Sequence, residues 1–141
     1  MRIANPIVSV PGAMKALMAL SEAAATTGID GDYAELICLR VSIMNGCGTC
    51  IDYHTKLLRK ANVADERIFA VAGWRDVPYY TDAEKAGFAL AEQITRVQVT
   101  DDVWAEAAKH YTEEQLAGLV IVCGAINLWN RMNVATDQKV A

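Results

Sequence analysis

The chain has 141 residues, of which 53% are hydrophobic and 21% are charged, and its net charge at pH 7 is -4. A chain of this size and composition is expected to fold as one domain over residues 1–141 and to bury a core without disulfide support. The acidic balance and the lack of a Lys/Arg run give no basic surface, so we expect neither nucleic acid nor membrane as a partner.

The N-terminal stretch that follows Arg2 has the outline of a secretory leader. Four residues interrupt it, namely Asn5, Pro6, Pro11 and Lys15, and no run of 18 apolar residues follows. We therefore expect neither export nor a membrane span, and a cytoplasmic location. In a reducing compartment, Cys-x-x-Cys is more often a redox or metal motif than a structural bridge.

Helical periodicity extends along nearly the whole chain, and no alternating strand pattern is present. A first helix is predicted from about Pro11 to Gly28. The next three helices are predicted over about 33–44, from Cys47 to about 62, and over 65–72. Asn45-Gly46 separates the second helix from the third.

The second half of the chain contains two capping-box patterns, Thr81 to Glu84 and Thr112 to Gln115. They predict helices near 82–97 and 113–128, with a shorter helix between them at 101–110. The segment GWRDVPYY is predicted as the main loop. The expected fold is therefore all-α, a single-domain bundle of about six to seven helices with Cys-x-x-Cys at the start of a central helix.

Residues 45–54 read NGCGTCIDYH and bring two cysteines and a histidine together. On a helix, Cys47 and Cys50 are i,i+3 neighbours, and Cys50 and His54 are i,i+4 neighbours. Both cysteines lie in the first turn, where the helix dipole favours a thiolate. His54 lies one turn from Cys50 but roughly 10.5 Å along the axis from Cys47. The histidine is therefore assigned to Cys50.

A thiol pair with a base suits the two-electron reduction of a peroxide or a disulfide. One thiolate attacks, and the second thiol displaces the oxidised product as a disulfide. Glu35 lies on the preceding helix, and the Asn45-Gly46 break can fold that helix back so that its carboxylate meets His54. Two arguments compete over which thiol attacks. The helix start favours Cys47 and the histidine favours Cys50, and we side with Cys50 because of the spacing.

Seven residues from Glu35 to His54 form the pattern E-x4-R-x-S-x2-N-x-C-x2-C-x3-H. This pattern resembles the alkylhydroperoxidase D (AhpD-like) branch of the carboxymuconolactone decarboxylase superfamily. The stretches WRDVPYYTDAEKAGFAL and AINLWNR also resemble its peroxidase-related members, so the likeness spans most of the chain. Thr49 stands where alkylhydroperoxidase D proper has a second histidine between the cysteines.

The resemblance implies an all-helical protein that assembles as a homotrimer or homohexamer. It also implies a thiol-dependent peroxidase (peroxiredoxin activity) that reduces hydrogen peroxide or organic hydroperoxides and needs no cofactor. Cys50 would be the peroxidatic thiol, Cys47 the resolving thiol, and Glu35 with His54 the proton relay. The implied partners are a hydroperoxide substrate and a dithiol reductant or redox adaptor protein.

Two other classes of function remain as alternatives. The first is a general thiol-disulfide oxidoreductase or redox sensor with low peroxide turnover. The second is a lactone decarboxylase-like or metal-binding module in which the cysteines are incidental. A closed zinc site is disfavoured because it usually takes four ligands, and no second Cys-x-x-Cys or histidine pair is present. Attached c-type haem is excluded because Ile51 follows the second cysteine.

The remaining candidate residues have structural interpretations. Cys38 and Cys123 lie in apolar helical stretches and are expected to be inert. His110 lies at a helix end and is expected to serve a surface or capping role. Three motif residues are expected to hold the turn rather than touch substrate, namely Arg40, Ser42 and Asn45. Four aromatic residues could line a pocket over the thiols or a subunit interface, namely Trp74, Tyr79, Tyr80 and Trp129.

Overall fold

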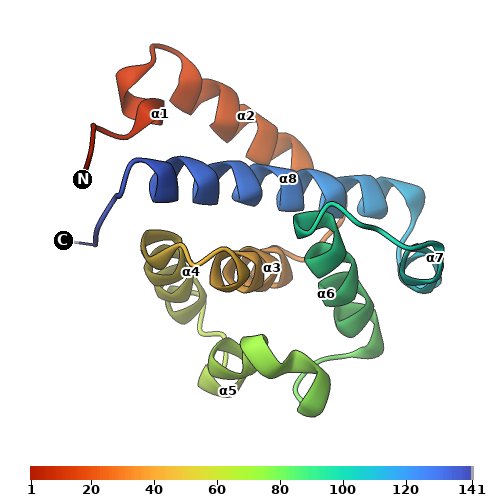
Figure 1. Cartoon of the computed structure of the whole chain (residues 1–141). Coiled ribbons are helices and arrows are strands. Elements are labelled where there is room, and N and C mark those ends of the chain that lie inside the picture. Colours follow the sequence, from red (N-terminus) through yellow and green to blue (C-terminus); the bar gives the residue numbers. More distant parts are fainter. Residues whose placement is uncertain (141) are drawn as a thin grey trace.

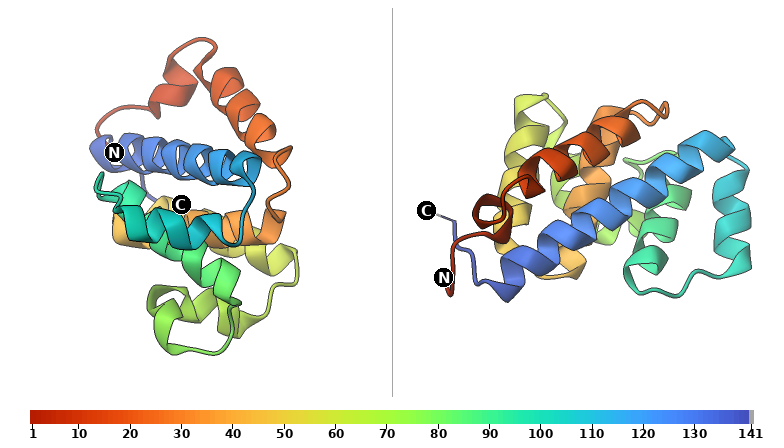
Figure 2. Two further views of the ribbon diagram at one scale, coloured as in Figure 1. Left: turned by 90° about the vertical axis from the view of Figure 1, so that its right-hand side faces the viewer. Right: turned by 90° about the horizontal axis from the view of Figure 1, so that it is seen from above.

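The computed structural model describes residues 1–140 and is all-helical over that range, which confirms the predicted fold class. The elements are α1 (Pro6–Ser9), α2 (Ala13–Ala25), α3 (Gly31–Met44), α4 (Gly48–Lys60), α5 (Asp65–Phe69), the 3-10 helix η1 (Ala70–Asp76), α6 (Asp82–Thr95), α7 (Asp101–Ala108) and α8 (Glu113–Ala135). Helix α8 crosses the molecule, with α1 and α2 on one side and α3 to α6 on the other (Figure 1). The views of Figure 2 confirm that α2 lies alongside α8.

The core is centred on Phe88 of α6, which is completely buried. Three aromatic rings surround it, at centroid distances of 5.1 Å for Tyr80, 5.4 Å for Tyr33 and 5.6 Å for Trp74. Two of these contacts are edge-to-face, an arrangement that aromatic pairs favour beyond the burial of their area. The cluster joins α3, η1 and α6 beneath α8.

Both predicted capping boxes are present. The side chains of Thr81 and Thr112 accept the backbone N–H groups of Glu84 and Gln115, which fixes the starts of α6 and α8 as predicted. Helix α8, however, continues to Ala135 instead of ending near residue 128. It continues because its last turns stay in contact with the rest of the molecule, with Asn130 completely buried.

Two short helices were not predicted. In α1, the Asn5 side chain accepts the N–H of Ile7 at 3.1 Å, and Pro6 occupies the first turn. Helix η1 occupies part of the segment predicted as the main loop. It is held in place because the Trp74 side chain is buried and its indole N–H donates to Glu92 at 2.8 Å.

Glu92 of α6 is the centre of a buried ion cluster, since its side chain is only 2% exposed. It accepts hydrogen bonds from Arg40 of α3 at 2.9 Å and from Arg75 of η1 at 2.7 Å, in addition to that from Trp74. Burial alone would raise the pKa of Glu92, but the hydrogen bonds from Arg75, Trp74 and Arg40 outweigh it and lower the pKa to about 2. Arg40 is therefore paired with Glu92 and holds α3 against α6, whereas the sequence predicted that it would hold the turn after α3.

The turn between α3 and α4 sets the position of the Cys-x-x-Cys motif. Gly46 has a φ of 65°, a conformation that glycine adopts at low cost. The N–H of Cys47 donates to the carbonyl of Ser42 at 3.0 Å, and that of Gly46 donates to Ile43 at 3.2 Å. These two bonds form a Schellman motif, which ends α3 and folds α4 back against it. None of the helices described is long and apolar enough to cross a membrane.

Candidate active site

The two motif cysteines are joined by a disulfide at the start of α4, with their Cα atoms 5.4 Å apart. Cys47 is the N-cap residue of this helix, and Cys50 lies in its first turn. Both are buried, with 1% of Cys47 and 5% of Cys50 exposed. The helix start favours negative charge at this position, so a thiolate formed on reduction is stabilised.

His54 lies one helical turn after Cys50 and is buried. Its Nδ1 atom is 2.6 Å from Oε2 of Glu35, so the predicted contact between α3 and α4 is present. A carboxylate at this distance favours the tautomer with a proton on Nδ1. The other ring nitrogen, Nε2, makes no hydrogen bond within residues 1–140, which leaves it available as a base.

A network of amide side chains fixes the turn before Cys47 to α8. Asn45 donates to the side-chain oxygens of Asn127 and Asn130, both at 2.9 Å. Asn130 in turn donates to the hydroxyl of Ser42 at 3.0 Å. Because Ser42 and Asn45 are occupied in this way, they hold the turn in shape, as the sequence predicted.

An open pocket of about 440 Å³ reaches Cys47 but is not lined by Cys50. It lies between the start of α4 and the end of α8 with the residues that follow. Its lining residues are Gly46, Cys47, Gly48, Thr49, Asn133, Val134, Asp137, Gln138, Lys139 and Val140. None of the four candidate aromatic residues lines this pocket. Trp74 and Tyr80 belong to the core instead, and the half-buried Trp129 packs against it. A role of Tyr79 or Trp129 at a subunit interface stays a prediction.

Each sulfur of the disulfide has one polar neighbour that the sequence did not identify as such. The hydroxyl of Thr49 lies 3.5 Å from the sulfur of Cys47. The side-chain amide of Asn133 donates to the sulfur of Cys50 at 3.2 Å. Asn133 lies on α8, 83 residues from Cys50, so no motif spacing connects the two.

The other two cysteines have surroundings that suppress thiolate formation. Burial raises the pKa of the Cys38 thiol well above its ordinary value, and the Glu35 carboxylate adds to the effect. Burial also raises the pKa of Cys123 to about 12. Both thiols therefore stay protonated at neutral pH, in agreement with the prediction that they are inert.

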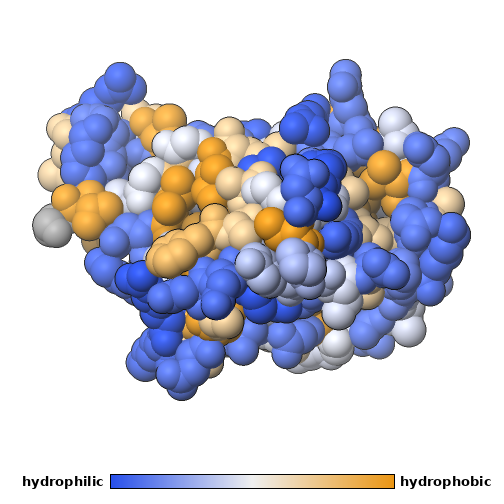
Figure 3. Space-filling view, turned by 90° about the horizontal axis from the view of Figure 1, so that it is seen from below, coloured by the Kyte–Doolittle hydropathy of each residue, from blue (hydrophilic) through white to orange (hydrophobic). Residues whose placement is uncertain are grey.

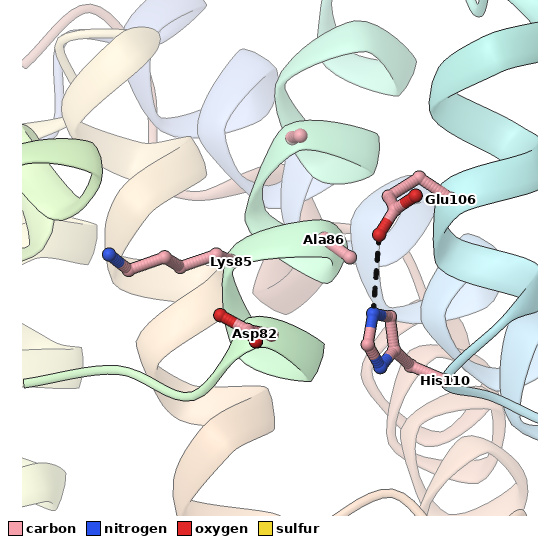
Figure 4. A pocket seen from close by; sticks show the side chains of 6 residues that line it. Asp82, Lys85, Ala86, Glu106 and His110 are labelled. Atoms are coloured by element: carbon pink, nitrogen blue, oxygen red, sulfur yellow. Dashed lines mark hydrogen bonds and ion pairs between the residues drawn. The ribbon is translucent and has the colours of Figure 1, made fainter.

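A second open pocket of about 350 Å³ lies between α6 and α7, at the end of the molecule away from α4. His110 and Glu106 contact each other there at 3.4 Å, whereas Lys85 points away from both (Figure 4). The charged side chains that line this pocket do not converge on a common point. Over residues 1–140, no group of three or more His, Cys, Asp or Glu side chains is arranged to hold a metal ion.

The model of the carboxymuconolactone decarboxylase family matches residues 11–93. This range contains Glu35, His54 and both cysteines of the disulfide. The chain belongs to the carboxymuconolactone decarboxylase family.

Relatives within the family differ in how much of the chain they share. The uncharacterised YdfG protein of Bacillus subtilis is 37% identical over 134 residues, covering 93% of this chain and 91% of its own. Alkyl hydroperoxide reductase AhpD of Solibacter usitatus is 44% identical over 59 residues, covering 42% of this chain. That match spans only 33% of the AhpD chain, so the likeness to AhpD is confined to a segment.

Solved structures share the fold over nearly the whole chain. A crystal structure of an Agrobacterium tumefaciens protein of unknown function, provisionally named an AhpD antioxidant defence protein, has a TM-score of 0.91 and 32% identity. The two chains cover 99% and 97% of each other. The debrominase Bmp8, solved with 2,3,4-tribromopyrrole, has a TM-score of 0.86 at 19% identity, covering 96% of this chain and 74% of its own. One fold therefore serves proteins with different chemistry.

Proposed function

We propose that this family member is a thiol-dependent peroxidase that reduces hydrogen peroxide or organic hydroperoxides through a dithiol-disulfide cycle of Cys47 and Cys50. The observation that carries the proposal is the pairing of His54 with Glu35, at 2.6 Å, one helical turn from the Cys47–Cys50 disulfide. The segmental likeness to AhpD supports it. A cytoplasmic location would supply the dithiols that the cycle needs.

In the oxidative step, the Cys50 thiolate attacks the terminal oxygen of the hydroperoxide. An S–O bond forms, the O–O bond breaks, and Cys50 becomes a sulfenic acid. His54 accepts the proton of the Cys50 thiol through Nε2 and delivers it to the departing oxygen, which leaves as an alcohol or water. Glu35 holds the imidazole through Nδ1, which leaves Nε2 directed to this proton transfer.

The Cys47 thiol then attacks the sulfenic sulfur, so that the disulfide forms and water departs. An external dithiol or a redox adaptor protein supplies two electrons to reopen it. One of its thiolates attacks Cys47, which the open pocket reaches, and Cys50 departs as a thiolate. The second thiol of the reductant resolves the mixed disulfide, which returns Cys47 to its reduced state. The cycle uses no cofactor and no metal.

Steady-state hydroperoxide consumption with dihydrolipoamide as the electron donor tests the proposal. We expect continuous turnover by the unaltered protein and by Cys38→Ser, and none by Cys47→Ser or Cys50→Ser. Disulfide reduction by dihydrolipoamide without hydroperoxide loss would overturn the proposal and favour a general thiol-disulfide oxidoreductase or redox sensor.

A further inference from the structure

The proposed cycle makes no use of the amide that contacts the Cys50 sulfur. Asn133 is partly buried near the end of α8, and its Nδ2 atom lies 3.2 Å from the sulfur. A disulfide sulfur is a weak acceptor, whereas a thiolate accepts a charge-assisted hydrogen bond. The same donor therefore gains strength when the disulfide is reduced.

The orientation of the Asn133 amide is set by the N-cap residue of α1. The Oδ1 atom of Asn5 is occupied, because it accepts the N–H of Ile7 at 3.1 Å. The Nδ2 atom of Asn5 is therefore the one that faces Asn133, and it donates to Oδ1 of Asn133 at 2.8 Å. With its oxygen engaged, Asn133 can present only its N–H group to Cys50.

The segment that carries Asn5 is fixed along the end of α8. The backbone N–H of Arg2 donates to the carbonyl of Thr136 at 2.8 Å, and the side chain of Gln138 donates to the carbonyl of Ile3 at 3.0 Å. Figure 1 shows both termini at this end of the molecule. The N-terminal segment is thus coupled through two amides to the sulfur of Cys50.

We infer that Asn133 is a catalytic hydrogen-bond donor to the Cys50 thiolate, and that Asn5 is the positioning residue that keeps this amide in its donating orientation. The inference deepens the proposed function, since it rests on Cys50 as the reacting thiol. A hydrogen-bond donor such as the Asn133 amide stabilises the thiolate form of Cys50 relative to the thiol. It also makes Cys50 the better leaving group when a reductant attacks Cys47.

Titration of Cys50 in a Cys47→Ser background tests the donor, with thiolate absorbance and alkylation rate followed against pH. Cys38 and Cys123 do not interfere near neutral pH, because burial raises the pKa of both. Asn133→Asp keeps the shape but replaces the donor by an acceptor, so we expect the pKa of Cys50 to rise by about one unit or more. Asn133→Ala removes the donor without adding charge, and a smaller rise is expected.

The positioning role is tested with two substitutions that both preserve a cap for α1. Asn5→Asp offers Asn133 only acceptor oxygens, so the amide is expected to turn its oxygen toward the sulfur and raise the pKa of Cys50. Asn5→Ser is neutral and too short to hold Asn133, so a smaller rise is expected. Asn62→Asp, at an exposed position, adds the same charge as Asn5→Asp and should leave the pKa of Cys50 unchanged.

An unchanged pKa of Cys50 in both Asn133→Asp and Asn133→Ala would overturn the donor role. A rise in Asn5→Asp that is absent from Asn5→Ser would indicate a simple charge effect and overturn the positioning role. The titration involves no hydroperoxide, so a protein without peroxidase turnover would contradict the proposed function, whereas the hydrogen bond from Asn133 to the Cys50 thiolate is decided by the titration alone.

Discussion

At the scale of single residues, helix position and polar neighbours divide the four cysteines into two chemical classes. Cys47 and Cys50 lie at the start of α4, next to polar side chains. Cys38 and Cys123 lie inside apolar helix contacts, where burial raises the pKa of each thiol. The first pair is therefore suited to redox chemistry and the second to packing.

This division predicts that mild oxidation joins only one pair of thiols. When the reduced protein is treated with one equivalent of hydroperoxide, peptide mapping should find Cys47 bridged to Cys50. Cys38 and Cys123 should still be free for alkylation after unfolding. A dominant bridge that involves either of them would show that the reactive site has been misplaced.

The Glu35–His54 pair should control the rate of the first attack without affecting the thiols themselves. We expect His54→Asn to slow single-turnover hydroperoxide loss by about 100-fold and Glu35→Gln by about 10-fold, because proton transfer is impaired. The matched control is Asp52→Asn, since Asp52 lies on the same helix and pairs with Lys56 at 2.6 Å on an exposed face. Equal rates in all three variants would exclude the relay.

Local spacing made most of the candidate site predictable from the sequence. Cys50 and His54 are one turn apart on one helix, and Asn45-Gly46 forces the reversal that brings Glu35 to His54. The role of Asn133 could not be predicted from the sequence, because its contact with Cys50 depends on how α8 packs over α4. Spacing within one helix carries no information about such a contact.

At the scale of elements, the two capping boxes gave the most accurate helix starts. Thr81 and Thr112 fix the starts of α6 and α8. The Asn5-Pro6 pair carried a start signal for α1, an N-cap residue followed by proline, and it was missed because the helix has only four residues. The η1 helix depends on the burial of Trp74 against Glu92, a tertiary contact that no local pattern reveals.

Glu92 should stabilise the packing of α3, η1 and α6 in a pH-dependent way. Its pKa in the folded protein, about 2, lies below the ordinary value of 4.5. Its contribution is therefore present above about pH 4.5 and is lost as the pH falls toward 2. We expect Glu92→Gln to lower the free energy of unfolding at pH 7 by about 3 kcal/mol, because two arginines lose their partner.

Urea unfolding at pH 7 and pH 3 measures this effect. The difference between Glu92→Gln and the unaltered protein should be large at pH 7 and smaller at pH 3, where the unaltered protein has lost part of the contribution of Glu92. Glu22→Gln, at an exposed position on α2, should behave like the unaltered protein. Equal unfolding midpoints for Glu92→Gln and Glu22→Gln at pH 7 would contradict the account.

At the scale of the whole molecule, much apolar surface remains uncovered. On α1 and α2, large exposed fractions are found for Val8 (74%), Met14 (42%) and Met18 (49%). On the opposite side, seen from below in Figure 3, hydrophobic side chains gather within a hydrophilic border. We expect surface of this kind on a small protein to be covered by another chain.

We therefore predict that the protein assembles as a homotrimer or homohexamer, because self-association buries this apolar surface. Light scattering at micromolar concentration should give three or six times the monomer mass. Met18→Glu should shift the equilibrium toward smaller species. A mass near the 15.3 kDa of one chain for the unaltered protein would contradict the prediction.

The fold alone does not select the reaction, since a debrominase shares it at 19% identity. We propose instead that the site selects it, with Cys50 as the thiol that attacks and His54 as its base. Single-turnover hydroperoxide loss in the two reduced cysteine variants distinguishes Cys50 from Cys47 as the attacking thiol. We predict that Cys47→Ser consumes one equivalent and stalls as a Cys50 sulfenic acid that a dimedone probe traps, whereas Cys50→Ser consumes none. Full first-turnover reactivity in Cys50→Ser, with none in Cys47→Ser, would contradict the account.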